Sequence, residues 1–371
     1  MPLVMDYDAT LDLYRRCGEA DLTMARIGYS DQDQIFGVVS GAARFAKDHS
    51  IDVLPIGIFS TVGHYILRSL PRYLTADHEL PSAGGDSKAY RRRLFRNARL
   101  STSFMKILVE EGDADYGRIH VTHHYDHGHH TLSGGGVSPN ELLRDLDFID
   151  LFSSVMFDDT HSPFEENVEN SIAYKDYLDR SGRKKVLEGC LEEVVAGGKG
   201  IDETLTTNPA QIEEYLERTK FELVVPNIGT ESIHARQVGV DWTLLEAIDR
   251  LGVGKRLVAH GFSSVRKLPI EEQRRLGVLG IVGMNAWSYI PQHIGPQLLE
   301  RAARILEAKD EVKGYPVDFD EAGSPVYNAS QDANVFFGPI LDQVRDLKVR
   351  LIGDSVYEIL DNLGYAVLAG R

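Results

Sequence analysis

The feature that most constrains this fold is the alternation of short apolar runs with amphipathic segments along most of the chain. Eight apolar runs have the length of buried strands, and apolar residues recur with a helical period between them. The predicted strands are Thr23–Ile27, Ile51–Ile58, Gly117–Thr122, Leu151–Phe157, Lys185–Cys190, Glu222–Ile228, Arg256–Ala259 and Leu279–Met284. Eight parallel strands, each followed by a helix, predict an α/β fold of the closed (β/α)8 TIM-barrel type rather than an open sheet.

The segments between these strands set the expected domain organisation. The predicted helices are Asp31–Asp48, Val62–Leu74, Pro139–Leu146, Pro163–Arg180, Pro209–Lys220, Trp242–Leu251, Ile270–Leu276 and Gln297–Ala308, with an extra helix around Lys88–Glu110. After Ala308 the strand and helix alternation stops. We therefore predict a barrel catalytic domain over residues 1–308 and a helical extension over 309–371. Its apolar segments Phe336–Leu347 and Leu351–Leu363 are expected to pack on the barrel or on a second subunit.

Composition excludes several classes of protein. A net charge of -16 repels polyanions and argues against a nucleic-acid or anionic-membrane partner. No apolar run approaches the length of a membrane span, and residues 1–15 lack the apolar core of a signal peptide. Only Cys17 and Cys190 are present, which fits a reducing compartment. We expect a cytoplasmic protein that does not bind membranes.

Histidines are concentrated in one segment of the chain, at the end of a predicted strand. Six of the thirteen lie between His120 and His130, where the third predicted strand ends. Barrel enzymes place their active sites at the carboxyl ends of the strands, and neutral imidazole is the commonest metal ligand. His127, His234 and His260 follow three different strands, so they can converge above the barrel as the three ligands of a catalytic metal site. A solvated histidine-rich loop is the alternative, and any one of these histidines taken alone is more often structural.

Long motifs across residues 20–305 are those of one family. They are His124-Tyr125-Asp126-His127-Gly128, the run from Ser154 to Asn167 (SVMFDDTHSPFEEN), Gly229-Thr230 with His234, His260-Gly261, and Gly280-Ile281-Val282 followed by Asn285. In this order and spacing the chain resembles the class II, zinc-dependent fructose-bisphosphate and tagatose-bisphosphate aldolases. The resemblance implies a metal-dependent lyase that cleaves or forms a carbon–carbon bond in a ketose or ketose phosphate through an enediolate.

The resemblance also implies roles for individual residues. His127, His234 and His260 would bind Zn²⁺ or another divalent metal, and Asp126 would transfer the proton of the substrate hydroxyl. Asp158 and Glu188 would lie at a second metal position or behind the metal ligands. The substrate-binding residues would be Ser60, Gly261, Ser263, Asn285 and Ser288. The family further implies a homodimer or homotetramer.

The substrate-binding half departs from the family pattern more than the metal-binding half. The family's Asn near the first strand is Gly28, and its phosphate-binding motifs carry the bulky Phe262 and Trp287. The second glutamate of the family's motif at the fifth strand is Cys190 in this chain, and the following loop lacks the family's paired acids. We therefore expect a substrate other than fructose 1,6-bisphosphate. An isomerase or epimerase on the same scaffold stays open, whereas Asp126 argues against a sugar-binding protein without turnover, which needs no proton-transferring carboxylate.

Overall fold

Eight parallel strands close into a barrel in the computed structural model, which describes residues 2–61, 87–128, 142–192, 207–230, 239–287, 289–307 and 341–370. Each strand pairs with the next in sequence, β4 pairs with β5, and β9 returns to β2. The barrel strands are β2 (Met24–Gly28), β3 (Leu54–Thr61), β4 (Ile119–Gly128), β5 (Ser154–Phe157), β6 (Val186–Cys190), β7 (Leu223–Val225), β8 (Leu257–Ala259) and β9 (Ile281–Ala286). All eight predicted strands and the TIM-barrel fold class are confirmed.

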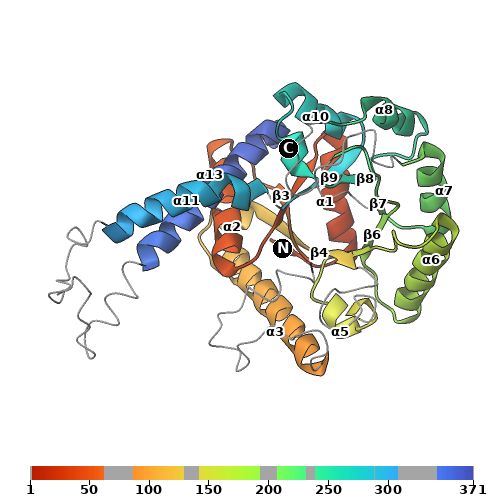
Figure 1. Ribbon diagram of the computed structural model, residues 1–371, viewed down its shortest axis with the longest axis horizontal. Helices are drawn as coiled ribbons and strands as arrows, with labels where there is room; N and C mark the ends of the chain where they lie inside the picture. The colour runs from red at the N-terminus through yellow and green to blue at the C-terminus, as the bar shows by residue number, and fades with distance from the viewer. Residues whose placement is uncertain are drawn as a thin grey trace.

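Helices surround this barrel (Figure 1). Five predicted helices are confirmed within a few residues at each end: α2 (Gln32–Asp48), α6 (Phe164–Arg180), α7 (Pro209–Thr219), α8 (Trp242–Arg250) and α10 (Ile270–Val278). Side-chain caps begin several of them, since Asp31 accepts a hydrogen bond from the Gln34 N–H and Asp241 accepts one from the Leu244 N–H. The predicted extra helix is α3 (Ser87–Lys106), which continues as a π-helical turn over Ile107–Glu111.

Two other predicted helices lie partly or wholly outside the described residues. All of Val62–Leu74 lies outside them, as do residues 139–141 of the predicted helix Pro139–Leu146. In the described part of the second segment, Leu142 and Leu143 are helical. The short helix α5 (Leu146–Ile149), capped by Asp145, follows them.

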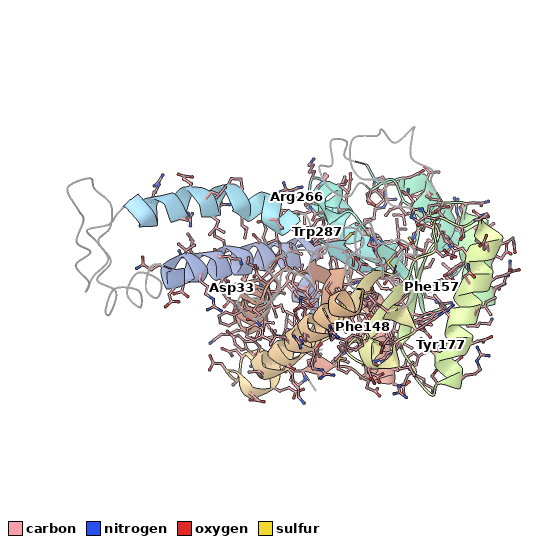
Figure 2. All side chains as sticks on the ribbon, turned by 60° about the horizontal axis from the view of Figure 1, so that its bottom comes forward. Asp33, Phe148, Phe157, Tyr177, Arg266 and Trp287 are labelled. Atoms are coloured by element: carbon pink, nitrogen blue, oxygen red, sulfur yellow. The ribbon has the colours of Figure 1, made fainter. Side chains whose placement is uncertain are left out.

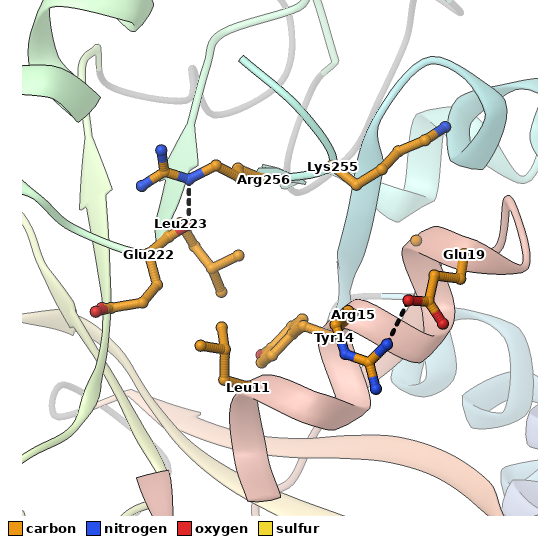
Figure 3. Close-up of a pocket in the computed structure, with 9 residues that line it drawn as sticks. Leu11, Tyr14, Arg15, Glu19, Glu222, Leu223, Lys255 and Arg256 are labelled. Atoms are coloured by element: carbon orange, nitrogen blue, oxygen red, sulfur yellow. Dashed lines mark hydrogen bonds and ion pairs between the residues drawn. The ribbon is translucent and has the colours of Figure 1, made fainter. Parts of the chain in front are cut away.

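The amino end of the chain was not predicted. Leu3–Val4 forms a short strand, β1, beside β4, and Tyr7–Glu19 forms α1, which Asp6 caps. This helix lies at the amino-terminal end of the barrel, where a pocket of about 520 Å³ separates it from the starts of β7 and β8 (Figure 3). Its Tyr14 is buried beneath the barrel strands. The helix thus covers the barrel end opposite to the one where active sites of this fold lie.

Two long helices at the carboxyl end lie side by side and project from the barrel (Figures 1 and 2). The helix α11 (Tyr289–Glu307) begins earlier than the predicted Gln297 and contains Pro296 within it. Both predicted C-terminal segments contribute to one continuous helix, α13 (Leu341–Leu363), except residues 336–340, which lie outside the described residues. It packs on α2, where glycines bring the backbones together: a Cβ atom on Gly41 would lie 2.4 Å from the Gly353 carbonyl oxygen. The domain boundary at residue 308 stays a prediction.

No helix within the described residues is both long and apolar enough to span a membrane.

Candidate active site

The histidine-rich strand β4 sends its side chains to two different environments. Residues of a strand alternate between faces, and His124 and Asp126 face the barrel interior, where both are buried. His123 and Tyr125 lie on the opposite face: the Tyr125 ring packs against Phe148, with ring centroids 5.3 Å apart. Only part of the histidine cluster therefore belongs to the site. His129 and His130 lie outside the described residues.

A β-bulge ends this alternation at Asp126 and His127. The pairing of β4 with β5 runs in register through Tyr125 and resumes at Gly128, with a shift between them. His127 has a φ of 51°, in the left-handed region that non-glycine residues rarely adopt. Bulges re-aim side chains next to active sites, and such strained backbone persists only where the surrounding structure holds it. Here the bulge turns two consecutive side chains towards one centre.

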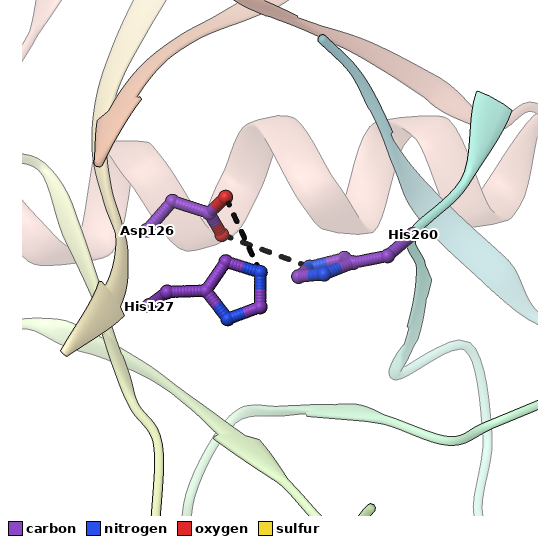
Figure 4. Close-up of side chains that lie close together, drawn as sticks. All are labelled: Asp126, His127 and His260. Carbon is purple, nitrogen blue, oxygen red and sulfur yellow. Dashed lines mark ion pairs between the residues drawn. The ribbon is translucent and has the colours of Figure 1, made fainter. Parts of the chain in front are cut away.

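The third group at this centre is His260, which directly follows β8. Its Nε2 lies 3.6 Å from Oδ1 of Asp126, and Nε2 of His127 lies 3.9 Å from Oδ2 of the same carboxylate. The two imidazole rings meet edge to face, with centroids 4.8 Å apart. Each of the three residues offers one ligand atom, and these atoms lie within 4.8 Å of one another (Figure 4).

Asp158 fixes the orientation of His127. The Nδ1–H of His127 donates to Oδ2 of Asp158 at 2.8 Å, and Oδ1 of Asp158 accepts from the backbone N–H and the hydroxyl of Thr160. This arrangement directs Nε2 of His127, the other ring nitrogen, towards the Asp126 carboxylate at the centre of the site. A carboxylate behind a ligand histidine sets its tautomer and raises its basicity in metal sites.

Asn285 of β9 joins the other two groups. Its Nδ2 donates to Oδ1 of Asp126 at 2.9 Å and lies 2.9 Å from Nε2 of His260. The hydroxyl of Thr230 donates to the backbone carbonyl of His260 at 2.6 Å, which holds the loop after β8. The site is therefore assembled from the carboxyl ends of β4, β8 and β9.

The electrostatics of the cluster favour a cation at its centre. Burial alone would lower the pKa of His127, but the carboxylates of Asp126 and Asp158 raise it to about 9. Burial alone would raise the pKa of Asp126, but His127, His260 and His124 hold it well below its usual range. Two imidazole nitrogens beside an ionised carboxylate are suitable donors for a divalent metal such as zinc. The residues present therefore fit the metal that the motifs imply.

A second buried layer lies directly beneath this cluster, within the barrel. Nε2 of His124 lies 3.5 Å from Oδ1 of Asp126 and 3.7 Å from Oε1 of Glu188. Glu188 in turn forms an ion pair with Arg26, and both side chains are completely buried. Neither Arg26 nor a role for His124 was predicted from the sequence. The signal that points to Arg26 is that it is the one charged residue in the predicted strand Thr23–Ile27.

The structure places the remaining predicted site residues as follows. His234 and Ser288 lie outside the described residues. Gly261, with a φ of 85°, and Ser263 lie where the short helix α9 (Phe262–Val265) begins after His260. Ser60 pairs in register with Tyr125 rather than with an inward-facing residue of β4. Its substrate-binding role stays a prediction, as do those of Gly261 and Ser263.

The two bulky departures from the family motifs are placed differently. Phe262 is buried and packs edge to face on Tyr289 of α11, with centroids 5.5 Å apart. Trp287 follows β9 and lies over Gly28 of β2, where a Cβ atom would meet Cδ1 of the indole at 2.6 Å. The small residue at 28 and the large one at 287 therefore compensate for each other. Figure 2 labels Trp287 near the start of α11.

Comparison with known proteins shows the family to which the chain belongs. The family model described as fructose-bisphosphate aldolase class-II matches residues 88–295, and the chain belongs to this family. A fructose-bisphosphate aldolase of Staphylococcus aureus (strain Mu50 / ATCC 700699) is 28% identical over 137 residues, which cover 35% of this chain and 46% of that protein. One from Staphylococcus epidermidis is 30% identical over 128 residues, covering 33% of this chain and 42% of that protein. The matches thus span about half the length of these relatives.

Solved structures share the fold along the whole chain. Fructose-bisphosphate aldolase (Fba) from Campylobacter jejuni superposes with a TM-score of 0.67 at 17% identity, covering 98% of this chain and 96% of that one. The YdjI aldolase from Escherichia coli K12 superposes with a TM-score of 0.57 at 14% identity, covering 98% of both chains. At these identities the likeness shows the common barrel fold.

The buried side chain of His123 is expected to make the free energy of unfolding depend on pH. Its Nδ1 lies 3.0 Å from the Leu151 carbonyl oxygen and 3.2 Å from the Thr102 hydroxyl, and burial lowers its pKa to about 3. The unfolded chain therefore binds a proton at mildly acidic pH that the folded chain does not bind. We expect this residue to lower the free energy of unfolding by about 1.4 kcal/mol for each pH unit below about 6.

Urea unfolding of the metal-free protein between pH 5 and 8 measures this effect. His123→Gln should unfold with a shallower acid dependence than the wild type. Thr102→Val, which removes a neighbour of the ring but no titrating group, should retain the wild-type slope. Parallel curves for the wild type and His123→Gln would show that His123 does not cause the acid sensitivity.

Proposed function

We propose that this protein is a metal-dependent aldolase-type lyase that cleaves or forms a carbon–carbon bond in a ketose or ketose phosphate through an enediolate. The observation that carries the proposal is the convergence of Asp126, His127 and His260 at the carboxyl ends of the barrel strands. The family membership of the chain supports it, as do the aldolases among its relatives.

His127 and His260, together with His234, would hold Zn²⁺ or another divalent ion. When bound, this ion supplies a Lewis acid that stabilises the negative charge developing on the substrate as the carbon–carbon bond breaks. Asp158 orients His127, and Asn285 positions both His260 and Asp126 through its amide nitrogen. These contacts fix the ligands before the ion arrives, which reduces the cost of assembling the site.

Asp126 is the proton-transferring group. It is ionised because of the histidines around it, and it stands beside the ligand His127. In the cleavage direction its carboxylate takes the proton of the hydroxyl whose carbon becomes the aldehyde. The electron pair of the broken bond goes to the carbonyl-bearing fragment, which becomes the enediolate. Such positioned proton transfer contributes about 10² to 10⁴ in rate.

Trp287 favours a substrate different from that of the fructose-bisphosphate enzymes. The indole fills the space that a side chain at position 28 would need, so the end of β2 and the end of β9 present a bulky aromatic group there. Phosphate sites work through close approach of bare backbone and polar groups, and an indole removes that approach. We infer that the substrate is smaller than fructose 1,6-bisphosphate or carries different substituents at this point.

An isomerase or epimerase remains the second candidate function, because it would use the same enediolate without releasing an aldehyde. Two departures from the aldolase pattern favour this second candidate: Trp287 in the phosphate-binding motif, and the loop without the family's paired acids. We further propose a cytoplasmic enzyme with a small-molecule sugar or sugar-phosphate substrate, no nucleic-acid or membrane partner, and a dimeric or tetrameric state.

Metal content tests the ligand assignment. We expect one tightly bound divalent ion per chain, and His127→Ala or His260→Ala should lower the content well below one after dialysis because a ligand is lost. His120→Ala is the matched control, since His120 lies in the same strand as His127 but is not in the group formed by Asp126, His127 and His260. Full metal content in both ligand variants, measured by elemental analysis, would refute the assignment.

Product analysis tests the reaction. Metal-loaded protein is incubated with a panel of ketoses and ketose phosphates, and both aldehyde release and epimer formation are followed. The proposal predicts aldehyde, and a loss of about 10² or more in kcat for Asp126→Asn with the metal retained. An epimer without aldehyde would establish the isomerase instead. Unchanged turnover in Asp126→Asn would assign proton transfer to another residue.

Substrate preference tests the role of Trp287. For fructose 1,6-bisphosphate we expect a wild-type kcat/KM below about 10⁴ M⁻¹s⁻¹, the lower end for ordinary enzymes. The pair Gly28→Asn and Trp287→Asp restores the family residues at both compensating positions and should raise this value relative to unphosphorylated ketoses. Trp287→Asp alone is the control, because it leaves the space over Gly28 unfilled. Efficient wild-type cleavage of fructose 1,6-bisphosphate would contradict the inference.

A further inference from the structure

A buried ion pair crosses the barrel beneath the candidate metal centre. Arg26 lies on β2 and Glu188 on β6, which are four strands apart in either direction round the barrel and so face each other across it. Nη1 of Arg26 bonds Oε2 of Glu188, and Nη2 lies 3.3 Å from Oε1. Both side chains are completely buried. The guanidinium thus holds both carboxylate oxygens in a fork.

The neighbouring strands are shaped to admit this arginine. A Cβ atom on Gly57 of β3 would lie 2.5 Å from Cγ of Arg26, and one on Gly283 of β9 would lie 3.2 Å from its Cδ. Any larger residue at Gly57 would therefore displace the arginine stem. Barrel interiors are normally filled by branched apolar side chains, so a long cation between two glycines is an unusual solution. The two glycines thus leave the space that the side chain of Arg26 occupies.

The carboxylate that Arg26 holds lies within reach of the metal-site histidines. Oε1 of Glu188 is 3.7 Å from Nε2 of His260 and 3.7 Å from Nε2 of His124. Glu188, His124 and Asp126 themselves form a group whose ligand atoms lie within 4.8 Å of one another. A free carboxylate at this depth would be a strong ligand for any divalent ion bound at His260.

We propose that Arg26 is a positioning residue that keeps the carboxylate of Glu188 out of the coordination sphere of the divalent ion. A further anionic ligand would fill a position that the substrate oxygens need and would weaken the ion as a Lewis acid. The fork from Arg26 satisfies the carboxylate without the metal. This inference rests on the proposed metal-dependent function and adds to it the reason why the nearest buried glutamate is not a ligand.

Metal affinity and the visible spectrum of the Co²⁺-loaded protein test this proposal. The variants are Glu188→Gln, Arg26→Met, the double variant and, as a matched control, Arg256→Met. Arg256 is a partly buried arginine at the opposite end of the barrel, where it donates to the Glu222 carbonyl oxygen. Co²⁺ absorbs strongly in four-coordinate sites and weakly when further ligands bind, so the spectrum reports an added ligand whether or not turnover changes.

The four variants are expected to differ in Co²⁺ affinity and in the Co²⁺ spectrum. Glu188→Gln and Arg256→Met should bind Co²⁺ with wild-type affinity and spectrum. Arg26→Met should bind it about tenfold or more tightly, with weaker absorption, because the freed carboxylate coordinates. The double variant should return to wild-type affinity, since an amide does not replace a carboxylate ligand. Recovery on removing a second charged group is a result that a purely structural role for Arg26 would not produce.

Two results would overturn the proposal. A tenfold loss of affinity in Glu188→Gln would show that Glu188 already ligates the ion in the wild type. An unchanged spectrum and affinity in folded Arg26→Met would show that the arginine does not restrain it. If Arg26→Met does not fold, Arg26→Lys decides between the outcomes, because it retains the charge but loses the fork. Absence of metal from the wild type would instead refute the proposed function itself.

Discussion

The site depends on one local backbone feature, the bulge at Asp126 and His127. In a regular strand these neighbours would point to opposite faces, and either the carboxylate or the imidazole would be directed away from the centre. The left-handed φ of 51° at His127 brings both to the same side, and the bond from His127 to Asp158 holds the ring there. His260 and Asn285 then complete the cluster from β8 and β9. The strain at one residue is thus supported by contacts from three strands.

Beneath this cluster, charge continues into the interior of the barrel. Asp126, His124, Glu188 and Arg26 follow one another downwards from the site, and each lies within 3.7 Å of the next. Burial alone would raise the pKa of Glu188, but Arg26 and His124 lower it to about 2, so the carboxylate stays ionised in the core. Breaking such a buried pair by removing one partner costs about 3–5 kcal/mol. The barrel therefore supports its site with a paired polar core instead of the usual apolar filling.

Much of this was predictable from the sequence because the barrel leaves a strong pattern in it. The eight apolar runs gave the strands, and the His124–Gly128 motif located the centre. The geometry of Asp126 relative to His127 was not predictable, since adjacent residues on a strand are expected to face apart. Arg26 escaped prediction because its partner Glu188 is distant in sequence and only the closed barrel brings them together. The helix α1 was not predicted because it precedes the first barrel strand and so lies outside the alternation of strands and helices, although its buried residues recur at helical spacing.

We propose that the bulge, His127 and His260 create a divalent metal site. Anomalous X-ray diffraction from a zinc-loaded crystal tests this, because it locates the ion without reference to activity. We predict one anomalous peak per chain at about 2.0–2.1 Å from a ring nitrogen of both His127 and His260, with Glu188 still paired to Arg26. A peak bound elsewhere, or a fully loaded crystal without density between these two histidines, would contradict it.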